Sequence, residues 1–94
     1  MANISYTELF LEIITVLESA TGYKGITKDE HLHAVPRLGI MTPAASQEVA
    51  QRLNARPKIQ AVSLVTTTDD VETSDTILEF QNLCWGKIPA ANKQ

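Results

Sequence analysis

A single cysteine, Cys84, occurs in the 94 residues, so no disulfide can form within the chain. Such sparing use of cysteine is typical of proteins from reducing compartments. No apolar run approaches the ~20 residues that a membrane-spanning helix needs. The first residues also lack the basic start and uncharged apolar stretch of a signal peptide. We therefore expect a soluble, cytoplasmic protein with no membrane partner.

Basic residues are few and scattered. Eight Lys and Arg stand against eleven Asp and Glu, which gives a formal net charge of −3. Nucleic-acid binding depends on clustered Lys and Arg side chains that contact phosphates, so no nucleic-acid partner is expected. Glycine-rich phosphate loops, nucleophile elbows and CxxC pairs are missing as well. We expect no cofactor and no enzymatic activity.

The apolar residues present suffice for one hydrophobic core, since 44% of the chain is hydrophobic. We expect one helical domain over residues 1–94, with a frayed tail at about 89–94. Its first helix is predicted over residues 6–21. Ser5 and Glu8 have the spacing of a capping box at its start, and apolar residues then recur at helical spacing.

Two further helices are predicted over residues 43–55 and 75–85. Thr42 followed by Pro43 is a strong helix start, because proline suits the first helical position, where its missing N–H costs nothing. The last helix has a capping residue at Thr73 or Ser74 and apolar residues at helical spacing after it. The sequence therefore predicts an all-α fold, a small bundle of three to four helices.

Shorter segments fill the gaps between these helices. Thr27 and Glu30 form a second capping-box pattern, which predicts a short helical segment over 28–35 that Pro36 ends. Residues 69–72 are acidic and are expected to form a short helical turn.

Residues 59–68 have the composition of a strand but no second strand to pair with. One interpretation is an exposed segment that contacts a protein partner or a second copy of the chain, through Ile59, Val62 and Leu64. The other is a loop that folds over the helices and closes the core.

Three residues invite a chemical interpretation. His31 and His33 have a spacing that places them on different sides of a helix, so two solvated histidines are favoured over a metal site. Metal binding or catalysis through these histidines stays as the alternative. Cys84 is flanked by apolar residues and is expected to be a buried, unreactive thiol. We expect no catalytic and no metal-binding residue.

The order of elements, together with Leu38-Gly39-Ile40-Met41-Thr42-Pro43, resembles the acyl and peptidyl carrier proteins. In that family a Leu-Gly-x-Asp-Ser-Leu motif opens the second helix, and its serine carries a phosphopantetheine arm. Leu38 and Gly39 match the motif, whereas Met41 replaces the acidic residue and Thr42 stands where the serine belongs.

The resemblance implies an acyl-carrier-like layout in which Thr42, at the degenerate cofactor position, stays unmodified. The chain would then be a pseudo-carrier, a non-catalytic module that docks on a protein partner. One alternative is a working carrier that is modified at an unexpected hydroxyl, Thr42 or Ser46. Another is an unrelated small bundle in which Thr42 and Pro43 serve only as a helix start.

Overall fold

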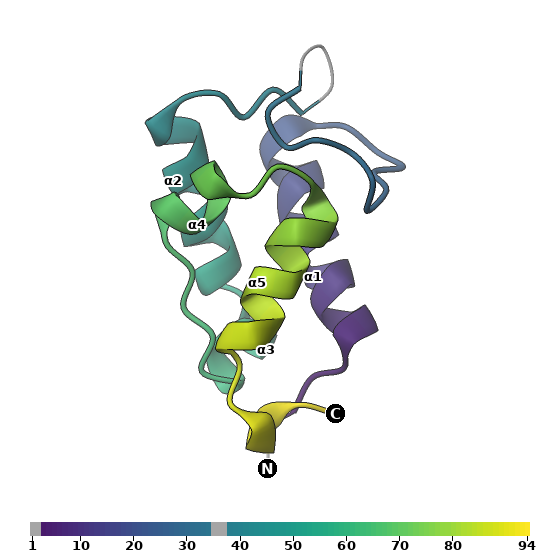
Figure 1. The fold of residues 1–94 in the computed structure, drawn as a ribbon, viewed down its shortest axis with the longest axis vertical. Coiled ribbons are helices and arrows are strands. Elements are labelled where there is room, and N and C mark those ends of the chain that lie inside the picture. The colour runs from purple at the N-terminus through teal and green to yellow at the C-terminus, as the bar shows by residue number, and fades with distance from the viewer. Residues whose placement is uncertain (1–2, 35–37) are drawn as a thin grey trace.

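Five helices and one short turn make up the computed structural model, which describes residues 3–34 and 38–94 (Figure 1). In these residues the chain forms no strand, only isolated bridges between Ile4 and Lys93 and between His31 and Thr76. The predicted all-α class is confirmed. The helices are α1 (Tyr6–Thr21), α2 (Pro43–Asn54), α3 (Pro57–Ala61), α4 (Thr68–Thr73) and α5 (Ile77–Lys87), and a 3-10 turn follows at Ala90–Asn92.

Helix α1 has the bounds that its sequence predicts. The Ser5 hydroxyl accepts the Glu8 N–H at 3.0 Å, and the Glu8 carboxylate accepts the Ser5 N–H at the same distance, so the capping box is complete. The helix ends at Gly22, whose φ of 79° is the left-handed conformation that glycine adopts without strain. Its N–H donates to the Glu18 carbonyl at 2.8 Å.

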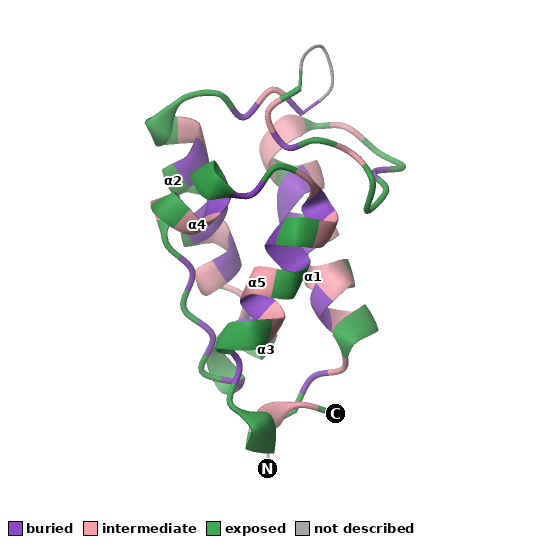
Figure 2. Cartoon of the chain, in the orientation of Figure 1, coloured by how far each residue is buried: buried purple, intermediate pink, exposed green. Residues whose placement is uncertain are grey.

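The hydrophobic core lies where α1 meets α2 and α5, and α4 packs against α2. Each of these helices turns its buried residues inward, which leaves the polar residues on the outside (Figure 2). This arrangement is how amphipathic helices hide one face from water. The largest fully buried side chains include Leu9, Ile13, Leu17, Leu53, Ile77 and Phe80.

The last helix is shifted from its predicted position. It spans Ile77–Lys87, and Thr76 caps it by accepting the Glu79 N–H at 3.2 Å. The predicted range was 75–85, with Thr73 or Ser74 as the cap. The shift arises because residues 28–34 form turns whose carbonyl oxygens bind the start of α5, through Ile77 N–H and Leu78 N–H. The short helix predicted there is absent from 28–34, while Val35 and Pro36 lie outside the described residues.

Residues 59–68 form neither a strand nor an exposed loop. Pro57 opens α3, which ends at Ala61 with Val62 as its cap, and Ser63 follows with φ of 63°. The Ser63 N–H donates to the Gln60 carbonyl at 3.1 Å and the Leu64 N–H to the Ile59 carbonyl at 3.2 Å. This pair of bonds is the Schellman pattern of helix ends. It reverses the chain and folds the following residues back over the helices.

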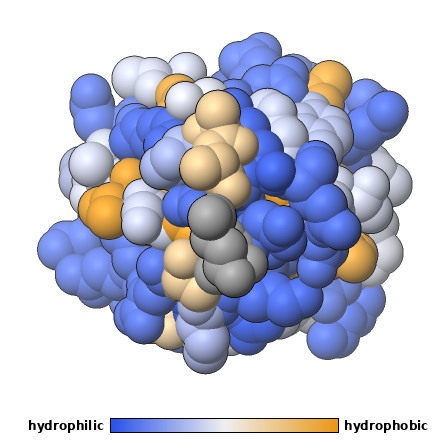
Figure 3. Space-filling view, turned by 90° about the horizontal axis from the view of Figure 1, so that it is seen from below, coloured by the Kyte–Doolittle hydropathy of each residue, from blue (hydrophilic) through white to orange (hydrophobic). Residues whose placement is uncertain are grey.

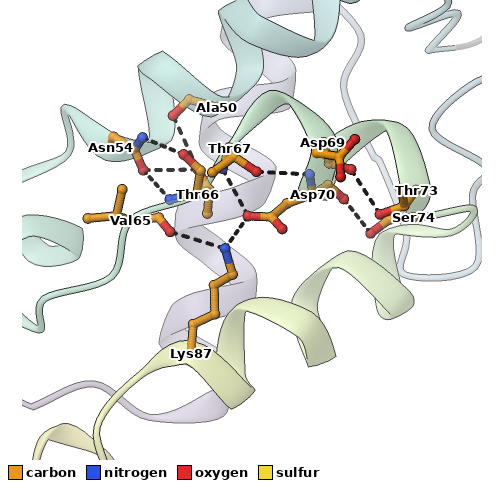
Figure 4. A network of polar contacts seen from close by, with 10 residues as sticks. All are labelled: Ala50, Asn54, Val65, Thr66, Thr67, Asp69, Asp70, Thr73, Ser74 and Lys87. Atoms are coloured by element: carbon orange, nitrogen blue, oxygen red, sulfur yellow. Dashed lines mark hydrogen bonds and ion pairs between the residues drawn. The ribbon is translucent and has the colours of Figure 1, made fainter.

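Side chains from α2 and α5 then hold the segment in place (Figure 4). Asn54 donates to the Thr66 carbonyl at 2.8 Å and accepts the Thr66 N–H at 2.8 Å and its hydroxyl at 2.9 Å. Lys87 forms an ion pair with Asp70 and donates to the Val65 carbonyl at 3.4 Å. Because a side-chain amide takes both backbone groups of Thr66, the segment needs no partner strand.

The tail is docked rather than frayed. The Ile4 N–H donates to the Asn92 carbonyl at 2.9 Å, and the Gln94 N–H donates to the Ile4 carbonyl at 2.9 Å. Asn92 also donates to the Val62 carbonyl at 3.1 Å, and the Lys93 ammonium lies 5.2 Å from the centre of the Trp85 ring. The expectation of a frayed 89–94 is therefore wrong, because the first residues before α1 supply backbone partners for the tail.

Candidate functional site

Thr42 lies at the start of α2 and caps it. Its hydroxyl accepts the Ala45 N–H at 3.1 Å, and its carbonyl accepts the Ser46 N–H at 3.0 Å. Pro43 follows at the first helical position. Thr42 itself is exposed. The sequence-predicted helix start is thus confirmed, and Thr42 stands at the surface at this helix end.

A hollow of about 420 Å³ opens beside this helix start. Ile40 is buried and forms part of its apolar wall, whereas Met41 is 66% exposed at the same place. The volume lies in the range of ligand pockets, roughly 300–1,000 Å³. We call this feature the α2 hollow. It is lined by His33, Ile40, Met41, Thr42, Pro43, Ser46 and Glu72.

Ser46 is the unusual member of this lining. It lies one turn beyond Thr42, on the same side of α2, and only 1% of its surface is exposed. Its hydroxyl forms no hydrogen bond with any residue that the structure describes. Although the residue is almost wholly buried, the hydroxyl oxygen is not sealed from solvent, so it is open to water or to a group that enters the hollow.

His33 connects the wall of the α2 hollow to the end of α4. Its Nδ1 contacts the Ile40 carbonyl oxygen, and its Nε2 lies 2.9 Å from the Ser74 carbonyl oxygen. Both ring nitrogens therefore face backbone acceptors. His31 instead lies 3.2 Å from the Asp75 carboxylate at the surface.

The two histidines thus serve separate contacts. Within residues 3–34 and 38–94, no group of three or more His, Cys, Asp or Glu side chains could hold a metal ion.

Cys84 lies in the core and is fully buried. Burial, with a smaller contribution from the charge of Asp70, raises the pKa of its thiol to about 12. A nucleophilic cysteine needs its thiolate form near neutral pH. The expected role of Cys84 as a small buried apolar side chain agrees with this environment.

Among the described residues, a carboxylate from α4 lines the α2 hollow. Glu72 is exposed at its edge and forms no ion pair with any residue in the described part of the chain. Most basic side chains of the protein are, in contrast, already paired with a carboxylate. These pairs are Lys24 with Glu18, Arg52 with Glu48, Arg56 with Glu12, Lys58 with Glu8 and Lys87 with Asp70.

The three residues predicted to contact a partner do not form a surface. Ile59, Val62 and Leu64 are 0%, 1% and 2% exposed and belong to the hydrophobic core. Their prediction as exposed contact residues is wrong, because the turn at the end of α3 folds them inward. The neighbouring Val65 is the exposed apolar residue of this segment. The end of the molecule that carries the termini, near α3, is mostly hydrophilic (Figure 3).

The sequence suggested Thr42 and Ser46 as alternative positions of one site, but it did not join His33 or Glu72 to them. Ser46 lies four residues after Thr42, a spacing that places both on one face of a helix. That spacing was the available signal for a shared site. His33 and Glu72 reach the α2 hollow only because the segment before α2 and helix α4 pack beside it. No pattern close to either residue in the sequence predicts this packing.

Comparisons with known proteins identify no relative. No family model matches the chain, and neither a curated protein nor a solved structure is detectably similar to it.

Proposed function

We propose that this protein is a non-catalytic helical binding module that docks on a protein partner through the surface at the start of α2. The observation that carries the proposal is Met41, which is 66% exposed beside the α2 hollow. A large exposed apolar side chain next to a hollow is the kind of anchor that protein interfaces use.

The chemistry of the candidate groups supports binding over catalysis. The thiol of Cys84 is buried and its pKa is raised to about 12, so it is not a thiolate at neutral pH. Both ring nitrogens of His33 face backbone carbonyl oxygens, which leaves this ring poorly placed to take a proton from a neighbouring hydroxyl.

The other partner classes have less support. The five paired basic side chains have little free charge to offer to the phosphates of nucleic acid. None of the helices in the described ranges combines the length and hydrophobicity that crossing a bilayer requires. The single, buried Cys84 is compatible with the cytoplasmic location that we propose.

The pseudo-carrier interpretation belongs to the same proposal. The resemblance to acyl carrier proteins places Thr42 where the family's serine opens the second helix, and Thr42 opens α2. Its hydroxyl already accepts a backbone N–H, and its extra methyl group crowds the oxygen. We therefore propose that Thr42 caps the helix and carries no phosphopantetheine arm.

A working carrier is the alternative, and the exposure of Thr42 favours that residue over Ser46, which is 1% exposed. Intact mass after co-expression with a phosphopantetheinyl transferase separates the two functions. We expect no mass increase. An increase that matches the arm, and that Thr42→Ser retains but Thr42→Ala loses, would establish the carrier function. Thr42→Ser is the matched variant because it keeps the helix cap.

The docking surface is tested with a photo-activated cross-linking residue in place of Met41 in cells. Leu11, which is 55% exposed on α1, provides the control position. We expect a protein cross-linked from position 41 and not from position 11, and we expect Met41→Asp to abolish its binding to the purified, folded chain. A cross-linked homodimer would show that the partner is a second copy of this chain. Equal cross-linking at both positions would refute the proposed surface.

A further inference from the structure

We propose that the α2 hollow binds a primary ammonium group at the end of an apolar chain, which a lysine side chain of the docked protein would supply. This inference rests on the proposed function and names the chemistry of its contact. The structural basis is an apolar wall, a hydroxyl that faces the hollow and a carboxylate at its edge, and neither polar group has a partner among the described residues.

The polar groups of the hollow favour a ligand that donates hydrogen bonds. The Thr42 hydroxyl and carbonyl already take the N–H groups of Ala45 and Ser46, and Pro43 has no N–H. The positive end of α2 is therefore largely satisfied, so this helix start is a poor anion site. What remains at the hollow is the Ser46 oxygen and the Glu72 carboxylate, both of which can accept.

Charge complementarity selects a cation. Among the described residues of the lining, Glu72 is the only carboxylate and none is Lys or Arg. Its carboxylate forms no ion pair with a described residue. An anionic ligand would be repelled by this carboxylate, whereas an ammonium ion would find a charge partner in Glu72 and an acceptor in the Ser46 hydroxyl.

The remaining lining fits the stem of such a group. Ile40, Met41 and Pro43 form the apolar side of the hollow. Lysine side chains commonly lay their methylene groups along apolar surface and keep the ammonium group at a polar edge. A compact ammonium ion with three donors suits a single hydroxyl and one carboxylate better than the planar fork of arginine, which favours two parallel acceptors.

The probe for this site is n-butylammonium, which reproduces the end of a lysine side chain. Two-dimensional ¹H–¹⁵N spectra of the whole protein would follow its titration. We expect saturable shifts at the amides of Met41, Ser46 and Glu72. Butanol, which lacks the charge, should bind more weakly, and butanoate, which reverses it, should not bind. Equal binding of butanoate, or shifts that never saturate, would overturn the assignment.

Two variants and one control assign the contacts. Glu72→Gln should weaken n-butylammonium binding by about three- to tenfold, and Ser46→Ala by about two- to tenfold. Asp69→Asn removes the same charge from the same helix but lies outside the lining, so the affinity should change by less than about twofold. An equal loss with Asp69→Asn would mean general attraction by an acidic surface and would refute the site.

This experiment separates the ammonium site from the docking surface. Binding of n-butylammonium needs no partner, so its absence would refute the site while cross-linking from position 41 could still establish docking. Conversely, specific binding of n-butylammonium with no cross-link at position 41 would refute docking and leave a site for a small amine.

Discussion

Two connecting segments, residues 62–67 before α4 and residues 38–42 before α2, bury and expose their side chains in a similar pattern. Leu64 is buried and Val65 exposed in one, and Ile40 is buried and Met41 exposed in the other. Their polar surroundings differ. In residues 62–67 a side-chain amide and a lysine bind the backbone, whereas beside residues 38–42 a buried hydroxyl has no described partner. The pattern of apolar residues alone therefore does not distinguish a core segment from an interface segment. We expect the distinction to come from whether the neighbouring polar groups have hydrogen-bond partners within the protein.

The largest effect should come from placing a charge in the first segment. Val62→Lys puts an unpaired ammonium group where 1% of the side chain is exposed, so we expect a loss of more than about 4 kcal/mol in the free energy of unfolding. Val65→Lys, at a residue that is 66% exposed, is the matched control and should change stability by less than about 0.5 kcal/mol. Urea unfolding measures both. A folded Val62→Lys protein of normal stability would show that the segment is not part of the core.

A smaller effect should separate the two polar environments. Asn54→Ala removes the partner of the Thr66 N–H and should cost about 1–3 kcal/mol, because that buried donor is left unsatisfied. Ser46→Ala removes a hydroxyl that has no described partner and should change stability by less than about 0.5 kcal/mol. Thermal or urea unfolding would compare them. Similar losses in both variants would mean that the Ser46 hydroxyl is bonded within the protein, which would remove the basis for a ligand there.

The smallest effect concerns acid. Burial alone would raise the pKa of Asp70, but the hydrogen bonds from Lys87 and from Thr67 outweigh it and hold the pKa below its ordinary value. A depressed carboxyl pKa stabilises the fold above the unfolded value of about 4, and this stabilisation is lost as the pH falls through the folded value. Asp70→Asn should therefore cost about 1 kcal/mol at neutral pH and flatten the loss of stability below about pH 4.

Hydrogen exchange would show where acid acts. The Thr66 amide, in the segment tied to Lys87 and Asp70, should lose protection at a higher pH than the Ile40 amide, which bonds to the Leu32 carbonyl. Equal loss at both amides would mean that the two segments open together and that Asp70 does not stabilise one of them selectively.

The sequence predicted those elements whose signals are local. The capping box at Ser5 and Glu8 and the Thr42-Pro43 pair define helix starts through contacts within four residues, and the structure agrees with both. The start of α5 was placed too early, because its first N–H groups bind the carbonyl oxygens of Lys28 and Glu30 from a distant loop. No pattern near α5 records that contact.

The fold of residues 59–68 was hidden for a different reason. The reversal after α3 uses Ser63 at φ of 63°, a conformation that a sequence normally marks with glycine. Without a glycine to indicate the turn, the apolar and β-branched composition of residues 59–68 favoured a strand. The candidate site could likewise be predicted only in part. Thr42 and Ser46 lie four residues apart at one helix start and were both considered. His33 and Glu72 reach the α2 hollow only through tertiary packing.

The docking of the tail has a consequence for how the chain folds during its synthesis. Ile4 is fully buried, and its two backbone hydrogen bonds are made by Asn92 and Gln94. Ile4 leaves the ribosome early, whereas both of its partners, Asn92 and Gln94, are synthesised much later. Helix α1 can form as it emerges from the ribosome. Ile4, in contrast, stays exposed until Asn92 and Gln94 have been made. We therefore expect closure of this end of the core to be a late step of folding, before which the buried face of α1 stays accessible to a chaperone.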